Sequence, residues 1–159
     1  MLPASLPGSI SIVAAALALS GGVATQSPPS TALTGPPPKP SISPSDVIGR
    51  WGLGAYHREH DRARTETITK GQCTQPYVIS AGNANTVMML THDNPKIVEV
   101  AIKANQEGRT FIGPGPDPGG ADDREVISYN GRVLILRWVD PEVAGRYGTQ
   151  LLVRCAPKA

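Results

Sequence analysis

Residues 125–139 read Glu-Val-Ile-Ser-Tyr-Asn-Gly-Arg-Val-Leu-Ile-Leu-Arg-Trp-Val, and this stretch decides the fold. Two runs rich in β-branched and aromatic side chains flank the dipeptide Asn130-Gly131, a pattern typical of a β-hairpin. Asn and Gly tolerate the positive φ angles of a type I′ turn. Residues 125–129 and 132–139 are therefore predicted to be antiparallel neighbours.

The two-residue period of half-buried strands continues on both sides of this hairpin. Two stretches, 98–103 and 149–154, show this alternation, which predicts strands with one inward and one wet face. The residues expected to face inward are Val98, Val100 and Ile102 in the first stretch and Thr149, Leu151 and Val153 in the second. Further strands are predicted, between turn residues, at 49–54, 77–80, 86–92 and 109–113. Eight short strands in succession predict an all-β, antiparallel up-and-down barrel, because closure removes both sheet edges.

Residues 57–66 interrupt the strand pattern with a charged run that suits a helix. Opposite charges lie three or four residues apart, as in Arg58 with Asp61, and such pairs stabilise helices. We expect one short helix lying on or across a barrel end, with a mobile charged loop as the alternative. Residues 113–123 are mostly Gly, Pro and Asp and are expected to form an exposed loop.

The composition divides the chain into three parts. Residues 9–19 form an apolar run of the length found in signal peptides, so residues 1–24 are predicted to be a signal peptide. This run is shorter than the roughly 20 residues that cross a bilayer, so we do not expect a membrane-spanning protein. Residues 25–45 are rich in Pro and are expected to be a disordered linker. Residues 46–159 form the predicted barrel domain.

The two cysteines, Cys73 and Cys155, are predicted to form a disulfide, because an even cysteine count in an exported chain favours pairing. A reactive thiol is the alternative, but no Cys-x-x-Cys motif supports it. Export and a disulfide together predict a periplasmic or secreted protein. The 15 Lys and Arg residues against 13 Asp and Glu leave a net charge of +2 without a basic cluster, so nucleic acid is not an expected partner.

Gly49-Arg50-Trp51 stands at the head of the first predicted strand, after the predicted signal peptide and linker. This Gly-x-Trp start and the layout of the chain resemble exported bacterial lipocalin-like barrels, in particular the periplasmic metalloprotease inhibitors and related envelope barrels. The resemblance implies an eight-stranded barrel with Trp51 sealing one end, and it makes inhibition of a hydrolase one expected activity. The cysteines are placed differently from those of the inhibitors.

No residue pattern assigns a catalytic residue, a metal or a cofactor. The imidazoles of His57, His60 and His92, with Asp93, have the chemistry of zinc ligands, but the charges at 57–66 are better explained by a solvated helix. The acidic residues of the 113–123 loop are interpreted as polar loop residues rather than calcium ligands: Asp117, Asp122 and Asp123.

Three aromatic residues, Trp51, Trp138 and Tyr147, either fill the core or line a ligand cavity, and the narrowness of an eight-stranded barrel favours the core. The candidate binding surface consists of five residues of the predicted helix: His57, Arg58, His60, Asp61 and Arg62. We expect an exported, non-catalytic binding module that recognises an envelope or extracellular protein or a small apolar ligand. A hydrolase inhibitor, a His-based metal-dependent enzyme and a structural envelope protein are the alternatives.

Overall fold

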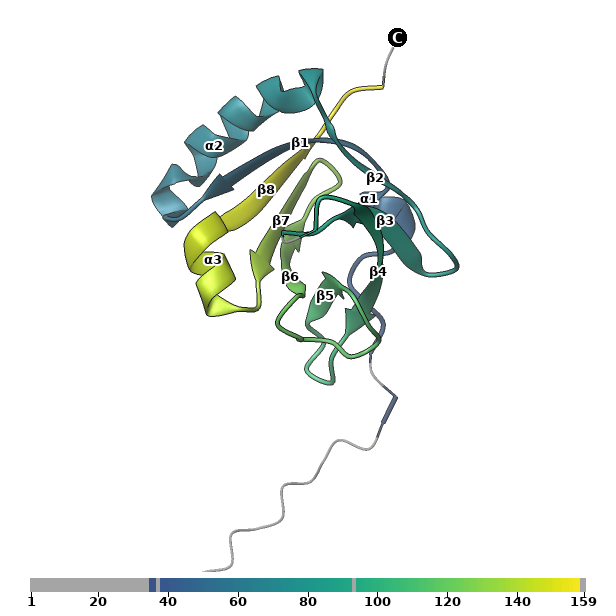
Figure 1. The fold of residues 1–159 in the computed structure, drawn as a ribbon. Coiled ribbons are helices and arrows are strands. Elements are labelled where there is room, and N and C mark those ends of the chain that lie inside the picture. The colour runs from purple at the N-terminus through teal and green to yellow at the C-terminus, as the bar shows by residue number, and fades with distance from the viewer. Residues whose placement is uncertain (1–34, 37, 93, 158–159) are drawn as a thin grey trace, which may run out of the picture. The chain divides into compact units, whose positions relative to one another are not determined.

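The computed structural model describes residues 35–36, 38–92 and 94–157, and in these residues eight strands form one closed antiparallel barrel (Figure 1). The strands follow chain order around the barrel, and the last pairs with the first. They are β1 (Gly49–Tyr56), β2 (Tyr77–Ala81), β3 (Thr86–Leu90), β4 (Ile97–Ala104), β5 (Thr110–Gly113), β6 (Arg124–Tyr129), β7 (Val133–Trp138) and β8 (Thr149–Arg154). The predicted all-β, eight-stranded barrel is confirmed.

The hairpin of β6 and β7 has a different turn from the predicted one. Val126 pairs with Leu136 but Ser128 pairs with Ile135, so one residue of β6 forms a bulge. With the register shifted, Asn130 pairs with Val133 by a backbone hydrogen bond of 3.2 Å, and its side-chain oxygen accepts the Val133 N–H at 2.8 Å. The prediction of a type I′ turn on Asn130 and Gly131 was therefore wrong. Asn130 does not have a positive φ angle, and it stabilises the turn through its side-chain oxygen instead.

Inward-facing apolar side chains fill most of the barrel. Leu134 and Leu136 on β7 meet Leu152 on β8 and Ile112 on β5, and all four are buried. Strand β8 therefore presents its even-numbered residues to the interior. The odd-numbered residues, which the alternation predicted to face inward, face outward instead. Leu151 and Val153 are nevertheless buried on this outer face.

The charged stretch after β1 does form a helix, in three continuous segments: η1 (Glu59–Asp61), α2 (Arg62–Thr69) and η2 (Lys70–Thr74). The helix α2 lies along the outer wall against β1 and β8 and not over a barrel end (Figure 1). Two glycines of β1 permit this close approach, because a Cβ atom on Gly52 or Gly54 would overlap Thr69. The expected position of the helix was wrong, since the outward apolar face of β8 needs a cover.

Two short helices were not predicted. The helix α3 (Pro141–Tyr147) starts at an Asp140 cap, whose carboxylate accepts the N–H groups of Glu142 and Val143 at 2.8 and 3.0 Å. The helix α1 (Pro44–Val47) precedes β1 and buries Val47.

The barrel domain also begins earlier than the expected boundary at residue 46. Ile42 is buried in the main apolar cluster, and the backbone N–H of Ser41 donates to the Thr110 hydroxyl at 2.8 Å. The end of the expected linker is thus part of the domain. Residues 1–34, which include the expected signal peptide, lie outside the described residues.

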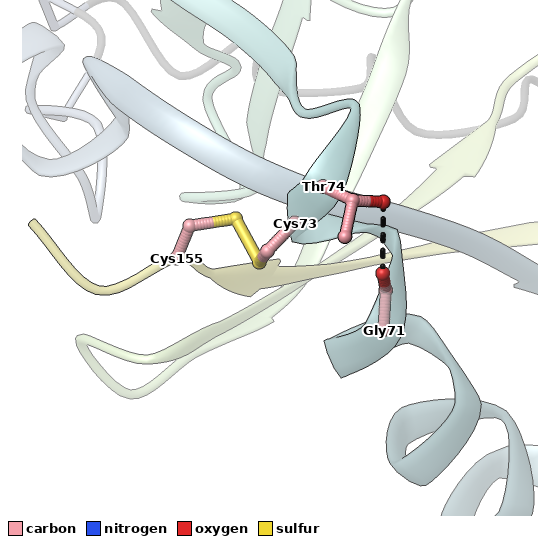
Figure 2. Close-up of a disulfide and its surroundings, with 4 residues drawn as sticks. All are labelled: Gly71, Cys73, Thr74 and Cys155. Atoms are coloured by element: carbon pink, nitrogen blue, oxygen red, sulfur yellow. Dashed lines mark hydrogen bonds between the residues drawn. A yellow bond between two sulfur atoms is a disulfide. The ribbon is translucent and has the colours of Figure 1, made fainter. Parts of the chain in front are cut away.

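Cys73 in η2 and Cys155 directly after β8 form the predicted disulfide (Figure 2). Their Cα atoms lie 5.6 Å apart, and the backbone N–H of Cys155 donates to the Arg50 carbonyl at 2.9 Å. The bridge therefore fastens the end of the helical segment to the end of the last strand.

Candidate functional site

One end of the barrel lies next to α1. Trp51 is fully buried there, and its indole N–H donates to the Val47 carbonyl of α1 at 2.8 Å. Arg154 lies over the Trp51 ring and donates to the carbonyls of Ile48 and Gly131 at 3.1 and 3.0 Å. Trp51 is therefore buried at the barrel end where β1 begins, in contact with α1.

The opposite end carries the connections 57–76, 114–123 and 139–148 and the described residues 91–92 and 94–96, and a pocket of about 230 Å³ opens there. Its floor consists of inward-facing strand residues, and its rim comes from the connections and α3. We call it the mouth pocket, and its lining residues are Leu53, Tyr77, Leu90, Thr91, His92, Arg124, Trp138, Tyr147 and Gln150.

Aromatic rings form one wall of the mouth pocket. The His92 ring lies 4.7 Å from the Trp138 ring and 6.1 Å from the Tyr147 ring, measured between centroids. Tyr77 lines the pocket as well, and its hydroxyl donates to the Leu90 carbonyl at 2.8 Å. Of the three aromatic residues expected to fill the core, only Trp51 lies in the main apolar cluster; Trp138 and Tyr147 line the pocket.

A buried cation lies at the floor of the mouth pocket. Arg124 is 4% exposed, and its side chain faces inward because it pairs with Ile112 on one side and Trp138 on the other. Its guanidinium lies 4.3 Å from the Trp138 ring centre, and its Nη2 donates to the Leu90 carbonyl at 2.7 Å. Arg124 and Gln150 were not predicted to be site residues. Arg124 lies two residues before Val126 on β6, so both side chains point to the same face of the strand, and the inward position of Val126 predicts an inward Arg124.

Two polar atoms of the mouth pocket are buried without a hydrogen-bond partner in the described part of the chain: Nε1 of Trp138 and Oε1 of Gln150. Buried polar atoms are rarely left unpaired in folded proteins. The pocket therefore combines an apolar lining with polar groups whose hydrogen-bonding capacity is unused.

The five residues of the predicted binding surface are only partly gathered. His57, Arg58 and Asp61 line a groove of about 580 Å³ beside α2, whereas His60 and Arg62 do not. His60 lies 3.7 Å from Asp61, and Arg62 lies 3.3 Å from the Glu59 carboxylate, both as exposed pairs. Tyr56 also lines this groove, and burial, followed by the nearby Glu59 carboxylate, raises the pKa of its hydroxyl.

The histidines are distributed over different surroundings. His57 lines the groove beside α2, His60 is exposed and His92 lines the mouth pocket. Among the described residues, which exclude Asp93, no group of three His, Cys, Asp or Glu side chains is placed to hold a metal ion.

The loop between β5 and β6 is largely exposed but is anchored at its end. Asp123 is 1% exposed, and its Oδ1 lies 2.9 Å from the Nζ of Lys103, which is 8% exposed. The other carboxylate oxygen accepts the N–H groups of Gly119 and Gly120, and Lys103 also donates to the carbonyls of Pro114 and Gly115. Asp123 is therefore a buried anchor and not one of the exposed loop residues expected from the sequence.

No protein-family model, curated protein or solved structure matches this chain. Within the described residues, none of the helices has the length and apolar character needed to cross a membrane.

Proposed function

We propose that this protein is an exported, non-catalytic binding module of the cell envelope, periplasmic or secreted, which takes a small and largely apolar ligand into the mouth pocket. The observation that carries the proposal is the pocket itself. Its apolar and aromatic walls surround a few polar groups, which is the usual composition of a ligand site. The volume of the mouth pocket is about 230 Å³, whereas pockets for drug-sized ligands have volumes of about 300–1,000 Å³. A ligand with one ring or a short chain therefore fits best.

Two features support export. The apolar run at residues 9–19 has the length and the small flanking residues of a signal peptide. The disulfide between Cys73 and Cys155 is of the kind that forms and persists in oxidising compartments.

Native mass spectrometry of protein isolated from its own source tests the proposal. We expect one small molecule per chain, released by organic solvent. The variant Leu53→Trp fills the pocket and should lose this mass, whereas Ile127→Trp adds the same ring at an exposed bulge of β6 and should retain it. An empty native protein, or equal occupancy in both variants, contradicts a ligand in the mouth pocket.

Recognition of a protein is the second candidate, and the groove beside α2 favours it. Ile68 is an exposed apolar residue in this groove. Two arginines, Arg58 and Arg64, and one carboxylate, Asp61, line the same groove, and this excess of positive charge suits an acidic partner surface. Inhibition of a hydrolase is the narrowest form of this candidate and rests on the resemblance.

Capture of proteins from an envelope extract on the immobilised oxidised chain separates the two candidates. One stoichiometric acidic protein that is lost with Ile68→Asp supports recognition through the groove. Retention of that protein by Ile68→Asp, or its loss with Leu53→Trp, contradicts the groove as the binding surface.

A further inference from the structure

We infer that the ligand of the mouth pocket carries a carboxylate that lies against the Arg124 guanidinium; this inference rests on the proposed function and adds the chemical class of the ligand. Among the described residues the barrel buries two cationic side chains, Lys103 on β4 and Arg124 on β6, and the two differ in their hydrogen-bond and ion-pair partners. Comparison of the two carries the inference.

Lys103 is the buried cation with a complete set of partners. Its ammonium group has the Asp123 carboxylate at 2.9 Å and two backbone carbonyls at 2.7 and 3.0 Å. Three acceptors satisfy its three N–H donors, and one of them neutralises the charge. The loss of hydration on burial is thereby compensated within the chain.

Arg124 is buried to a similar extent, but the described residues do not give it such a set of partners. Its guanidinium has five N–H donors, and the Leu90 carbonyl accepts one of them at 2.7 Å. The Trp138 ring faces the cation at 4.3 Å but supplies no counter-charge. In the described parts of the chain no carboxylate lies within ion-pair distance of Arg124. A bound anion would complete its coordination.

The neighbouring groups fit a carboxylate in particular. Trp138 is 3% exposed, and its unpartnered indole N–H lies in the ring over which the guanidinium stacks. A carboxylate has two oxygens, so one can accept from Arg124 while the other accepts from this N–H. Gln150 lines the same pocket, and its side-chain oxygen has no hydrogen-bond partner among the described residues. Rotation of the amide group by about 180° places its NH₂ group there, which can donate to the carboxylate. Leu53 and Tyr147 leave an apolar space for the rest of the ligand.

The test compares two probes of nearly equal shape, benzoate and benzamide, on the oxidised full chain. The indole N–H signals in a ¹⁵N–¹H spectrum report on binding, with Trp138 in the pocket and Trp51 at the barrel end next to α1 as an internal control. We expect benzoate to shift the Trp138 signal saturably, leave Trp51 unchanged and bind at least about tenfold more tightly than benzamide. Its affinity should fall with added salt.

Variants assign the effect to the guanidinium. Arg124→Gln should weaken benzoate binding by about tenfold or more without changing benzamide binding, and Arg124→Lys should retain part of the affinity. Arg137→Gln removes the same charge from the outer face of β7 and is the matched control. Where Arg124→Gln does not fold, the comparison of the two probes on the unaltered chain decides.

The outcomes separate this inference from the proposal beneath it. Equal affinity for both probes, or benzoate binding that survives in Arg124→Gln, overturns the carboxylate while leaving a ligand site in the pocket. No shift of Trp138 with either probe at millimolar concentration overturns both.

Discussion

The Arg154 guanidinium lies 4.2 Å from the centre of the Trp51 ring, so the end of the last strand covers the start of the first. The two residues are direct partners in the β1–β8 pairing that closes the barrel. Arg154 also donates to the Asp46 carbonyl and to the Tyr129 hydroxyl, which connects α1 and the β6–β7 hairpin to the same point. One side chain therefore joins the end of β8 to the β6–β7 hairpin and to the continuous segment of α1 and β1, which are distant from one another in sequence.

Replacement of Arg154 should destabilise this end of the barrel. Arg154→Met leaves the carbonyls of Ile48 and Gly131 without their donor and removes the cation from the Trp51 ring, and we expect a loss of about 2–3 kcal/mol. Urea unfolding followed by Trp fluorescence measures it. Arg132→Met, at an exposed position in the β6–β7 turn, is the control and should change stability by less than about 0.5 kcal/mol. Equal effects of the two variants would contradict the assigned role of Arg154.

The ion pair of Lys103 and Asp123 should be needed for the loop between β5 and β6. Lys103→Met leaves the buried carboxylate with two backbone N–H donors and no counter-charge, so we expect a loss of about 3–5 kcal/mol. Thermal unfolding measures the loss, and faster amide hydrogen exchange at Gly119 and Gly120 locates it. Lys96→Met removes an exposed charge just before β4 and should leave both measurements unchanged. Unaltered exchange in Lys103→Met would show that the pair does not anchor the loop.

The close approach of α2 to β1 can be tested with alanine. The added methyl group in Gly54→Ala overlaps the Thr69 hydroxyl, and we expect a loss of about 1–3 kcal/mol. Removal of that hydroxyl in Thr69→Ala should restore part of the stability in the double variant. Gly145→Ala, in α3 with no atom near the new methyl group, should be neutral or stabilising by up to about 1 kcal/mol. A Gly54→Ala protein as stable as the unaltered one would mean that the helix is not held at this distance.

The disulfide should account for a large part of the stability. It closes a loop with a sequence separation of 82 residues, for which chain entropy gives roughly 4–5 kcal/mol as an upper value. We expect Cys73→Ser/Cys155→Ser to lower the urea midpoint accordingly. Thiol titration of the unreduced, denatured protein should find no free thiol. Two thiols per chain would contradict the bridge and, with it, the support that it gives to export.

Local patterns explain why the strands were predictable. Alternating side chains and turn residues determine strands individually, and the eight predicted segments correspond to β1–β8 with small differences at their ends. The register depends on longer-range contacts, so the bulge in β6 moved the turn from Asn130 and Gly131 to the next residue pair. The position of α2 depends on Gly52 and Gly54 matching Thr69, and no local pattern contains that match.

The candidate site was less predictable than the fold. The charge pattern at 57–66 predicted a helix but not which of its residues lie together, and His60 and Arg62 lie outside the groove beside α2. Arg124 directly precedes the predicted strand at 125–129 and was not included in it. Its inward direction follows only from its pairing with Ile112 and Trp138 across two neighbouring strands.

Two carboxylates should make stability sensitive to acid. Hydrogen bonds from the Ser43 hydroxyl and backbone N–H lower the pKa of Asp46, and bonds from the Thr86 hydroxyl and the Asn83 N–H lower the pKa of Glu99. Because each folded pKa is lower than its unfolded value of about 4, the bonds stabilise the protein above that pH and are lost as the pH falls through the folded pKa.

Single substitutions should separate the two groups. Ser43→Ala should raise the pKa of Asp46 part of the way to its ordinary value, because the backbone donor remains, and should leave Glu99 unchanged. Thr86→Val should do the reverse, so each variant is the control of the other. Carboxyl ¹³C signals followed from pH 6 to pH 2 measure both values in one titration. A parallel shift of the two groups in either variant would indicate a general change of structure and contradict the assigned hydrogen bonds.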